Sequence, residues 1–254
     1  VYNYPDYDEI TAQQKNYIQT LVNEFEDALW STDFEDSILG YRPYINTRSF
    51  VDYFIVNEFA RNVDGFKKSR NFYKDKSSKD DLIYAGPVWD FDWAFKDHSS
   101  NMLNGAGWRH DYSGPTDVKP PGWYIRLIQD SIFANELSCR YLNLRNTILD
   151  TTNLFHFIDS VSSLINNAQE RHFIRWPILG INVGTPEIGV QPLSYNEEII
   201  KFKTWIIDRL NWLDINMPGN CPNVGIKEKH DSYLVTYPNP SLNQLNIYSE
   251  TTIK

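Results

Sequence analysis

Residues 49–95 read SFVDYFIVNEFARNVDGFKKSRNFYKDKSSKDDLIYAGPVWDFDWAF, and the hydrophobic period changes once within this stretch. In its first part, apolar side chains recur at helical spacing and cover nearly every side of the segment. The pattern predicts a buried helix from about Thr47 to Arg61, with Ser49 as a candidate cap.

Beyond this helix the apolar residues alternate with polar ones. Residues 71–74 and 82–85 flank a turn rich in Lys, Ser and Asp, which predicts a β-hairpin. Gly86-Pro87 interrupts the second strand before the sequence Trp89-Asp90-Phe91-Asp92-Trp93. On a continuing strand both aspartates would face one side, and a cation between them would relieve the repulsion of the two charges.

Helical periodicity governs most of the remaining chain, so we expect a mainly α fold with a small β-hairpin, in the α+β class. Two segments with little periodicity, 98–121 and 180–193, are expected to be loops, and the longer one is of a length often found over functional sites. The other expected helices cover residues 11–29, 122–128, 133–147, 154–176 and 195–213.

The charge and the hydropathy pattern exclude two classes of partner. A net charge of −9 argues against nucleic acid, because phosphate binding needs a basic face. No segment approaches the roughly 18 consecutive apolar residues of a membrane-spanning helix. The first residues lack the features of a signal peptide, and Val1 in place of an initiator methionine suggests a fragment of a longer protein.

The cysteines and the aromatic residues each allow two interpretations. Cys139 and Cys221 lack the spacing of a zinc site, so they form one disulfide in an oxidising compartment or remain two buried thiols. The aromatic content of 15% suits a glycan-binding surface, but packing in the core is the favoured explanation.

Carboxylates stand at both ends of the predicted hairpin, with Asp64 before it and Asp90 and Asp92 after it. Folding would bring them together beside Asn71, and such oxygen-rich sites suit Mg²⁺ when substrate phosphates complete the coordination. Protein kinases place an Asp, an Asn and a further Asp in this order. Turns also favour Asp and Asn, so the order alone indicates such a site weakly.

Cationic residues follow Asp64 directly. Lys67, Lys68 and Arg70 are candidates to contact phosphate, and a solvated charged turn explains each of them equally well.

The stretch from Ser49 to Phe95 resembles the CotH kinase family, which is named for spore-coat protein H. The resemblance rests on NEFARNVDG at the helix end, the polar hairpin and GPVWDFDWAF, and it continues to Trp123, Trp205, Arg209 and Trp212. It implies an atypical, kinase-like C-terminal lobe at residues 1–217 and transfer of the ATP γ-phosphate to a Ser, Thr or Tyr hydroxyl of a protein.

The resemblance also implies roles for single residues. Asp64 matches the catalytic Asp, and Lys67 and Lys68 are the candidates to bind ATP. Asn71, Asp90 and Asp92 are the candidates to hold Mg²⁺, Mn²⁺ or Ca²⁺. Six residues separate Asp64 from Asn71, whereas kinases have four, and the residues before Phe50 are too few for an ATP-clamping N-terminal lobe. We therefore expect this chain alone to be inactive.

The end of the chain changes character after a linker at 218–230. Tyr237-Pro238-Asn239-Pro240 followed by a strand-like segment at 245–248 resembles the start of a type IX secretion sorting domain, here partial, at 231–254. That resemblance implies a secreted or cell-surface protein that interacts with the type IX secretion machinery.

Two alternatives stay open at the level of sequence. A noncatalytic surface protein, or pseudokinase, would bind glycan, protein or Ca²⁺ instead of transferring phosphate. A glycoside hydrolase would use Asp64 with Asp90 or Asp92 and needs carboxyl groups about 5–9 Å apart.

Overall fold

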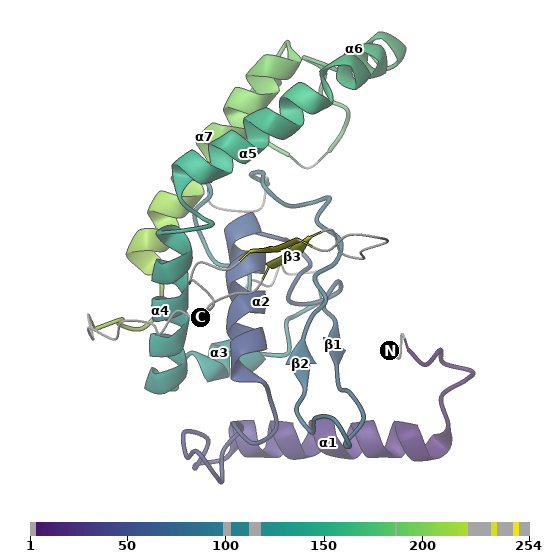
Figure 1. Cartoon of the computed structure of the whole chain (residues 1–254), viewed down its shortest axis with the longest axis vertical. Coiled ribbons are helices and arrows are strands. Elements are labelled where there is room, and N and C mark those ends of the chain that lie inside the picture. The colour runs from purple at the N-terminus through teal and green to yellow at the C-terminus, as the bar shows by residue number, and fades with distance from the viewer. Residues whose placement is uncertain are drawn as a thin grey trace. The chain divides into compact units, whose positions relative to one another are not determined.

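The computed structural model describes residues 4–98, 103–111, 118–185 and 187–222, and the backbone of 235–237 and 246–248. Helices dominate the chain and one short antiparallel hairpin lies among them, which confirms the predicted mainly helical α+β class (Figure 1). Within the described residues no helix has the length and apolar character needed to cross a membrane.

The chain divides into two compact units, Val1–Asn220 and Cys221–Lys254. In the second unit, strands β3 (Val235–Tyr237) and β4 (Asn246–Tyr248) pair antiparallel, which confirms a strand near 245–248. The rest of the predicted sorting segment lies outside the described residues.

Helix α2 (Thr47–Ala60) is the centre of the first unit, as expected from its apolar surface. Most of its residues are buried, and it contacts β2 (Tyr84–Ala85), α4 (Ser131–Arg145) and α7 (Tyr195–Asn216) (Figure 1). The buried cluster around α2 is strongly aromatic, so much of the aromatic content serves packing. Its rings include those of Phe50, Tyr53, Phe54, Phe66 and Tyr124.

The residue that caps α2 differs from the prediction. Asn46, and not Ser49, is the N-cap, and its side chain accepts a hydrogen bond from the Ser49 backbone N–H at 2.9 Å. Asn46 precedes the first helical turn, whereas Ser49 lies inside it, where its N–H needs an acceptor. The Ser49 hydroxyl instead accepts a bond from the Ala85 N–H at 3.1 Å and so ties α2 to the hairpin.

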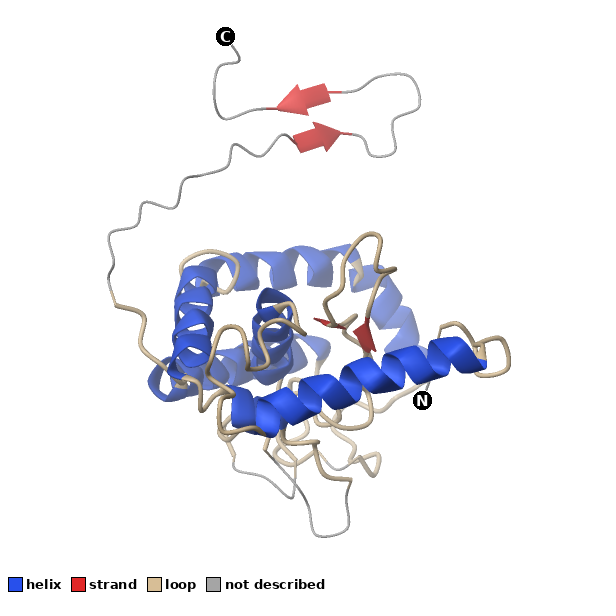
Figure 2. Cartoon of the chain, turned by 90° about the horizontal axis from the view of Figure 1, so that it is seen from below, coloured by secondary structure: helices blue, strands red, loops and turns tan. Residues whose placement is uncertain are grey.

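The hairpin consists of β1 (Phe72–Tyr73) and β2, paired as Phe72 with Ala85 and Tyr73 with Tyr84. Its turn reaches α1 (Ala12–Trp30), where the hydroxyls of Tyr17 and Ser77 lie 3.0 Å apart. Figure 2 shows α1 running across one side of the unit. Helix α1 also packs on α3 (Trp123–Leu127), with the rings of Phe25 and Trp123 in edge contact at 5.0 Å.

The single helix predicted over 154–176 is wrong, because the structure divides it. Helix α5 (Thr151–Leu164) and α6 (Asn166–Arg175) are separated at Ile165, whose φ of −93° and ψ of 6° depart from helical values. The two asparagines that follow are weak helix formers, so little opposes the break. Helix α5 then runs beside α7 (Figure 1).

Candidate functional site

The candidate site is built on the turn that follows α2. Arg61 ends the helix in the left-handed conformation, with φ of 49° and ψ of 45°. The backbone N–H of Asn62 then donates to Asn57 O at 2.9 Å, which closes the last helical turn. The chain is thereby directed away from the helix axis immediately before Asp64.

Asp64 accepts hydrogen bonds from residues that follow it in the turn. Its backbone carbonyl accepts hydrogen bonds from the N–H groups of Lys67 and Ser69, each at 3.0 Å. Its carboxylate lies 3.3 Å from the Nζ of Lys67, whose side chain is only 2% exposed, while about a third of the Asp64 side chain remains accessible. Tyr53 fixes the turn from α2 by donating its hydroxyl to Gly65 O at 2.7 Å.

Ser69 brings the two acidic segments together. Its N–H donates to Asp64 O, and its hydroxyl donates to Asp90 Oδ2 at 2.9 Å. A second contact holds the same segments, since Asn62 Nδ2 lies 3.4 Å from Trp89 O. Asp64 and Asp90 are therefore both bonded to Ser69, Asp64 through its backbone carbonyl and Asp90 through its carboxylate, although 26 positions separate them in the sequence.

Asn71 joins the same assembly from the base of β1. Its Nδ2 donates to Pro87 O at 3.3 Å, and the Gly86 N–H donates to Asn71 O at 2.9 Å. The side chain is half-buried beside the segment that leads to Asp90.

Residues 88–93 do not continue the second strand, so the predicted strand arrangement of the two aspartates is wrong. Asp90 has a φ of 64°, and the Ala94 N–H donates to Phe91 O in a turn. Asp90 and Asp92 are both exposed, and Trp89 between the hairpin and Asp90 is 66% exposed. The left-handed conformation of Asp90 turns the chain where alternation alone would extend it.

The remaining predicted site residue, Lys68, is exposed, and Lys67 is buried against Asp64. The phosphate-binding role of these lysines stays a prediction. So do the assigned roles of Asp64, Asn71, Asp90 and Asp92, although the hydrogen bonds above connect all but Asp92 and Lys68 to one assembly.

A buried ion pair joins the end of α2, just before the turn, to α7. Glu58 and Arg209 are both fully buried, with Arg209 Nη2 donating to Glu58 Oε2 at 2.9 Å. Glu58 also accepts from the backbone N–H groups of Arg109 and His110 and from His110 Nδ1 at 2.8 Å. Arg209 donates in addition to the carbonyls of Glu58, Gly105 and Gly107.

A second acidic residue, Asp97, also accepts hydrogen bonds from several parts of the chain, as Glu58 does. Its carboxylate accepts from Arg61 Nη1 and from Trp205 Nε1, each at 3.0 Å, and from the N–H groups of Asn104 and Gly105. Burial and the neighbouring Arg109 charge lower the pKa of Arg61 to about 10. Asp97 was not predicted from the sequence, because its partners lie up to 108 positions away.

The oxygen atoms of Asp90 and nearby side chains are of the type that binds a hard divalent cation, although they would supply only part of its coordination. Across the described residues, no three His, Cys, Asp or Glu side chains form a group able to hold a metal ion. One or two carboxylates with substrate phosphates and water are the usual environment of Mg²⁺. Asp90 and Asp92 are exposed carboxylates and Asn71 Nδ2 bonds Pro87 O, so a metal site shared by these residues stays a prediction.

The cysteines were left open by the sequence. Cys139 and Cys221 are both disulfide-bonded.

One comparison with known proteins gives a match. A family model described as CotH kinase protein matches residues 1–213, most of the chain, and these include every residue of the candidate site. No curated protein matches the chain.

Proposed function

Because this chain belongs to the CotH kinase protein family, we propose that it carries the catalytic turn of a secreted phosphotransferase. The reaction moves the γ-phosphoryl group of ATP to a hydroxyl of a protein substrate. The hydroxyl oxygen forms a bond to the γ-phosphorus, the bond from that phosphorus to the β–γ bridging oxygen breaks, and ADP leaves.

The observation that carries the proposal is the position of Ser69 between Asp64 and Asp90. Ser69 bonds both segments, the first through its backbone N–H and the second through its hydroxyl, and in kinases the corresponding segments orient the acceptor hydroxyl and hold the metal ion. Asp64 is accessible enough to accept a proton from a hydroxyl, while Lys67 and the turn hold it in place. Catalysis of this kind consists mainly of positioning and charge neutralisation.

The metal ion would be held by Asp90, with Asp92 and Asn71 as further candidates. A bound Mg²⁺ would neutralise charge on the phosphates as the transfer proceeds. Ser69 restrains one oxygen of Asp90, which limits the orientations of the carboxylate. Lys67 and Lys68 are the candidates to face the ATP phosphates.

The test separates binding from transfer in three variants. We expect Asp90→Asn to weaken Mg²⁺–ATP binding at least tenfold in calorimetry, or about 1.4 kcal/mol. Asp64→Asn should keep that binding, and when the chain is joined to an ATP-clamping lobe it should lower phosphoryl transfer about 100-fold or more. Asp75→Asn is the matched control, because it removes one exposed carboxylate of the hairpin turn far from the site.

Two results would overturn the proposal. One is unaltered Mg²⁺–ATP binding in Asp90→Asn. The other is undiminished transfer of labelled phosphate in Asp64→Asn.

A second candidate function is supported by the exposed rings beside the aspartates. Trp89 is 66% exposed and Trp93 is 42% exposed, and flat rings on a surface suit glycan or protein recognition without catalysis. If the chain binds glycan or protein but no Mg²⁺–ATP, this pseudokinase function replaces the first.

We also propose a secreted or cell-surface location, with export through the type IX machinery. The disulfide-bonded cysteines support an oxidising compartment, because disulfides persist there and are rare in the cytosol. Fusing residues 231–254 to a secreted reporter and measuring its export in a type IX-competent bacterium tests the role of the tail.

A further inference from the structure

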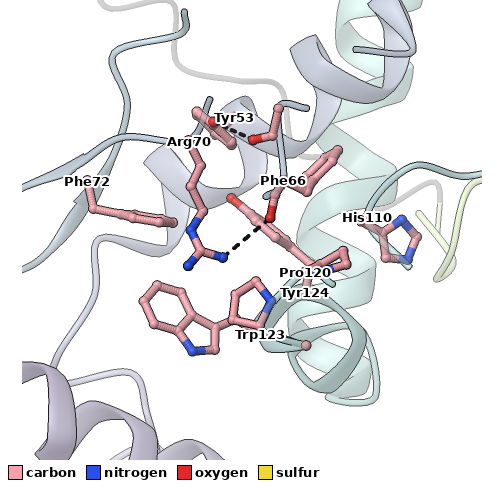
Figure 3. Close-up of a pocket in the computed structure, with 11 residues that line it drawn as sticks. Tyr53, Phe66, Arg70, Phe72, His110, Pro120, Trp123 and Tyr124 are labelled. Carbon is pink, nitrogen blue, oxygen red and sulfur yellow. Dashed lines mark hydrogen bonds between the residues drawn. The ribbon is translucent and has the colours of Figure 1, made fainter. Parts of the chain in front are cut away.

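A small cleft opens beside the Asp64 turn, between that turn, β1 and α3 (Figure 3). The space inside it that a water molecule can reach is about 10 Å³, roughly what a single water needs. It therefore admits neither a nucleotide nor a whole side chain, and a ligand would meet the cleft at its mouth, where Arg70 is half-buried. Its walls are mostly rings, from Tyr53, Phe66, Phe72, Pro120, Trp123 and Tyr124.

Arg70 is the cation of this cleft. Figure 3 shows its guanidinium between Phe72 and Trp123, and its Cζ lies 5.8 Å from the centroid of a Trp123 ring. Its one hydrogen bond within the described chain is long, from Nη1 to Phe66 O at 3.4 Å. A guanidinium carries five N–H donors, so most of the hydrogen-bonding capacity of Arg70 is left for a ligand.

No carboxylate of the described chain balances this charge at close range. The residues that line the cleft include no Asp or Glu, and Arg70 forms no salt bridge within the described residues. Glu26 contributes a weak attraction, but its Oε1 accepts from Trp123 Nε1 at 2.7 Å. Burial is the main influence on Arg70 and lowers its pKa. A half-buried cation without a close counter-ion favours binding of an anion.

The cleft lies close to where an acceptor hydroxyl would react. Gly65 and Phe66 form one wall and follow Asp64 directly in the chain. An extended polypeptide advances about 3.3 Å per residue, so its neighbouring side chains would reach the cleft from a hydroxyl held at Asp64.

We propose that this cleft binds the carboxylate of an Asp or Glu in the protein substrate, within a few residues of the acceptor hydroxyl. The guanidinium donates to the carboxylate, and charge-assisted bonds of this kind are about twice as strong as neutral ones. This inference rests on the proposed phosphotransferase function, because it names the substrate class of that site.

The experiment uses the whole chain and pairs of immobilised peptides. Each peptide has one central Ser, and the members of a pair differ only in a Glu or a Gln placed one to four residues before or after it. Binding is measured without nucleotide, so it does not depend on phosphoryl transfer. At one or two spacings we expect at least fivefold tighter binding of the Glu peptide, with the preference lost in Arg70→Gln and kept in Arg70→Lys.

Lys79→Gln is the control for net charge, because Lys79 is an exposed cation of the hairpin turn. It should keep the Glu preference. Equal binding of Glu and Gln peptides by the unmodified chain at every spacing would overturn the inference without reference to any variant. A Glu preference that persists in Arg70→Gln would overturn it as well. Loss of transfer in Asp64→Asn with no Glu preference would leave the phosphotransferase proposal standing and reject the cleft.

Discussion

Removing the Glu58 carboxylate should destabilise the protein by several kcal/mol, because it leaves a buried cation without its counter-ion. In Glu58→Ala, Arg209 loses its only carboxylate partner within the described residues while remaining fully buried. The N–H groups of Arg109 and His110 lose their acceptor at the same time.

The size of the effect follows from these contacts. Breaking a buried ion pair by removing one partner costs about 3–5 kcal/mol, because the other charge stays buried. Three backbone carbonyls still accept bonds from Arg209, which argues for the lower part of that range. A loss of about 3 kcal/mol lowers Tm by roughly 6–12 °C in a protein of this size.

The assay is urea unfolding followed by tryptophan fluorescence, for Glu58→Ala, Arg209→Met and the double variant that combines these two substitutions. The double variant removes both charges, so its loss should be smaller than the sum of the two single losses by about 0.5–3 kcal/mol. A loss under about 1 kcal/mol in Glu58→Ala, or strict additivity in the double variant, would refute the reasoning.

Three further predictions concern the same unit. Asn46→Ala should destabilise the protein by about 1 kcal/mol through loss of the α2 cap, whereas Asn46→Asp should restore most of it; an unchanged urea midpoint in the alanine variant would contradict the capping role. Gly65→Ala places a Cβ 2.1 Å from Asn57 Oδ1, so we expect the stability of the fold to fall by about 1–3 kcal/mol from overpacking and Mg²⁺–ATP binding to weaken in calorimetry. Unchanged stability and unchanged binding would contradict this prediction, because the turn would then accommodate the methyl group. Burial alone would raise the pKa of Glu58, but the His110 hydrogen bond and the Arg209 charge lower this pKa overall. The Glu58 carboxylate should therefore stabilise the fold fully above about pH 4.3 and progressively less as the pH falls through its folded pKa. In acid titrations, Glu58→Gln should lose less stability between about pH 5 and 3 than the unmodified chain.

The helices and the hairpin were predictable because their signals are local. The apolar residues of α2 repeat within one segment, and the polar turn separates two alternating runs. The break at Ile165 was missed because apolar residues continue through it. The cap at Asn46 was missed because the first turn contains a second residue able to cap.

The site was predictable in part. The order of Asp64, Asn71 and Asp90 indicated which residues gather, and the structure joins these segments through Ser69 and Asn71. The left-handed conformation of Asp90 has no signal in an alternating pattern. Pairings such as Glu58 with Arg209 depend on tertiary structure, so periodicity contains no trace of them.

The tie between Glu58 and Arg209 has a consequence for the order in which the protein assembles. Arg209 follows Glu58 by 151 residues, and at about 5–20 residues per second a ribosome needs roughly 8–30 s to make that interval. During this time the carboxylate of Glu58 has no guanidinium of Arg209 to meet, so the nascent α2 cannot bury it at low cost. The buried ion pair next to the turn that follows α2 therefore forms only after Arg209 has been synthesised, and a partly made chain that ends before Arg209 lacks it.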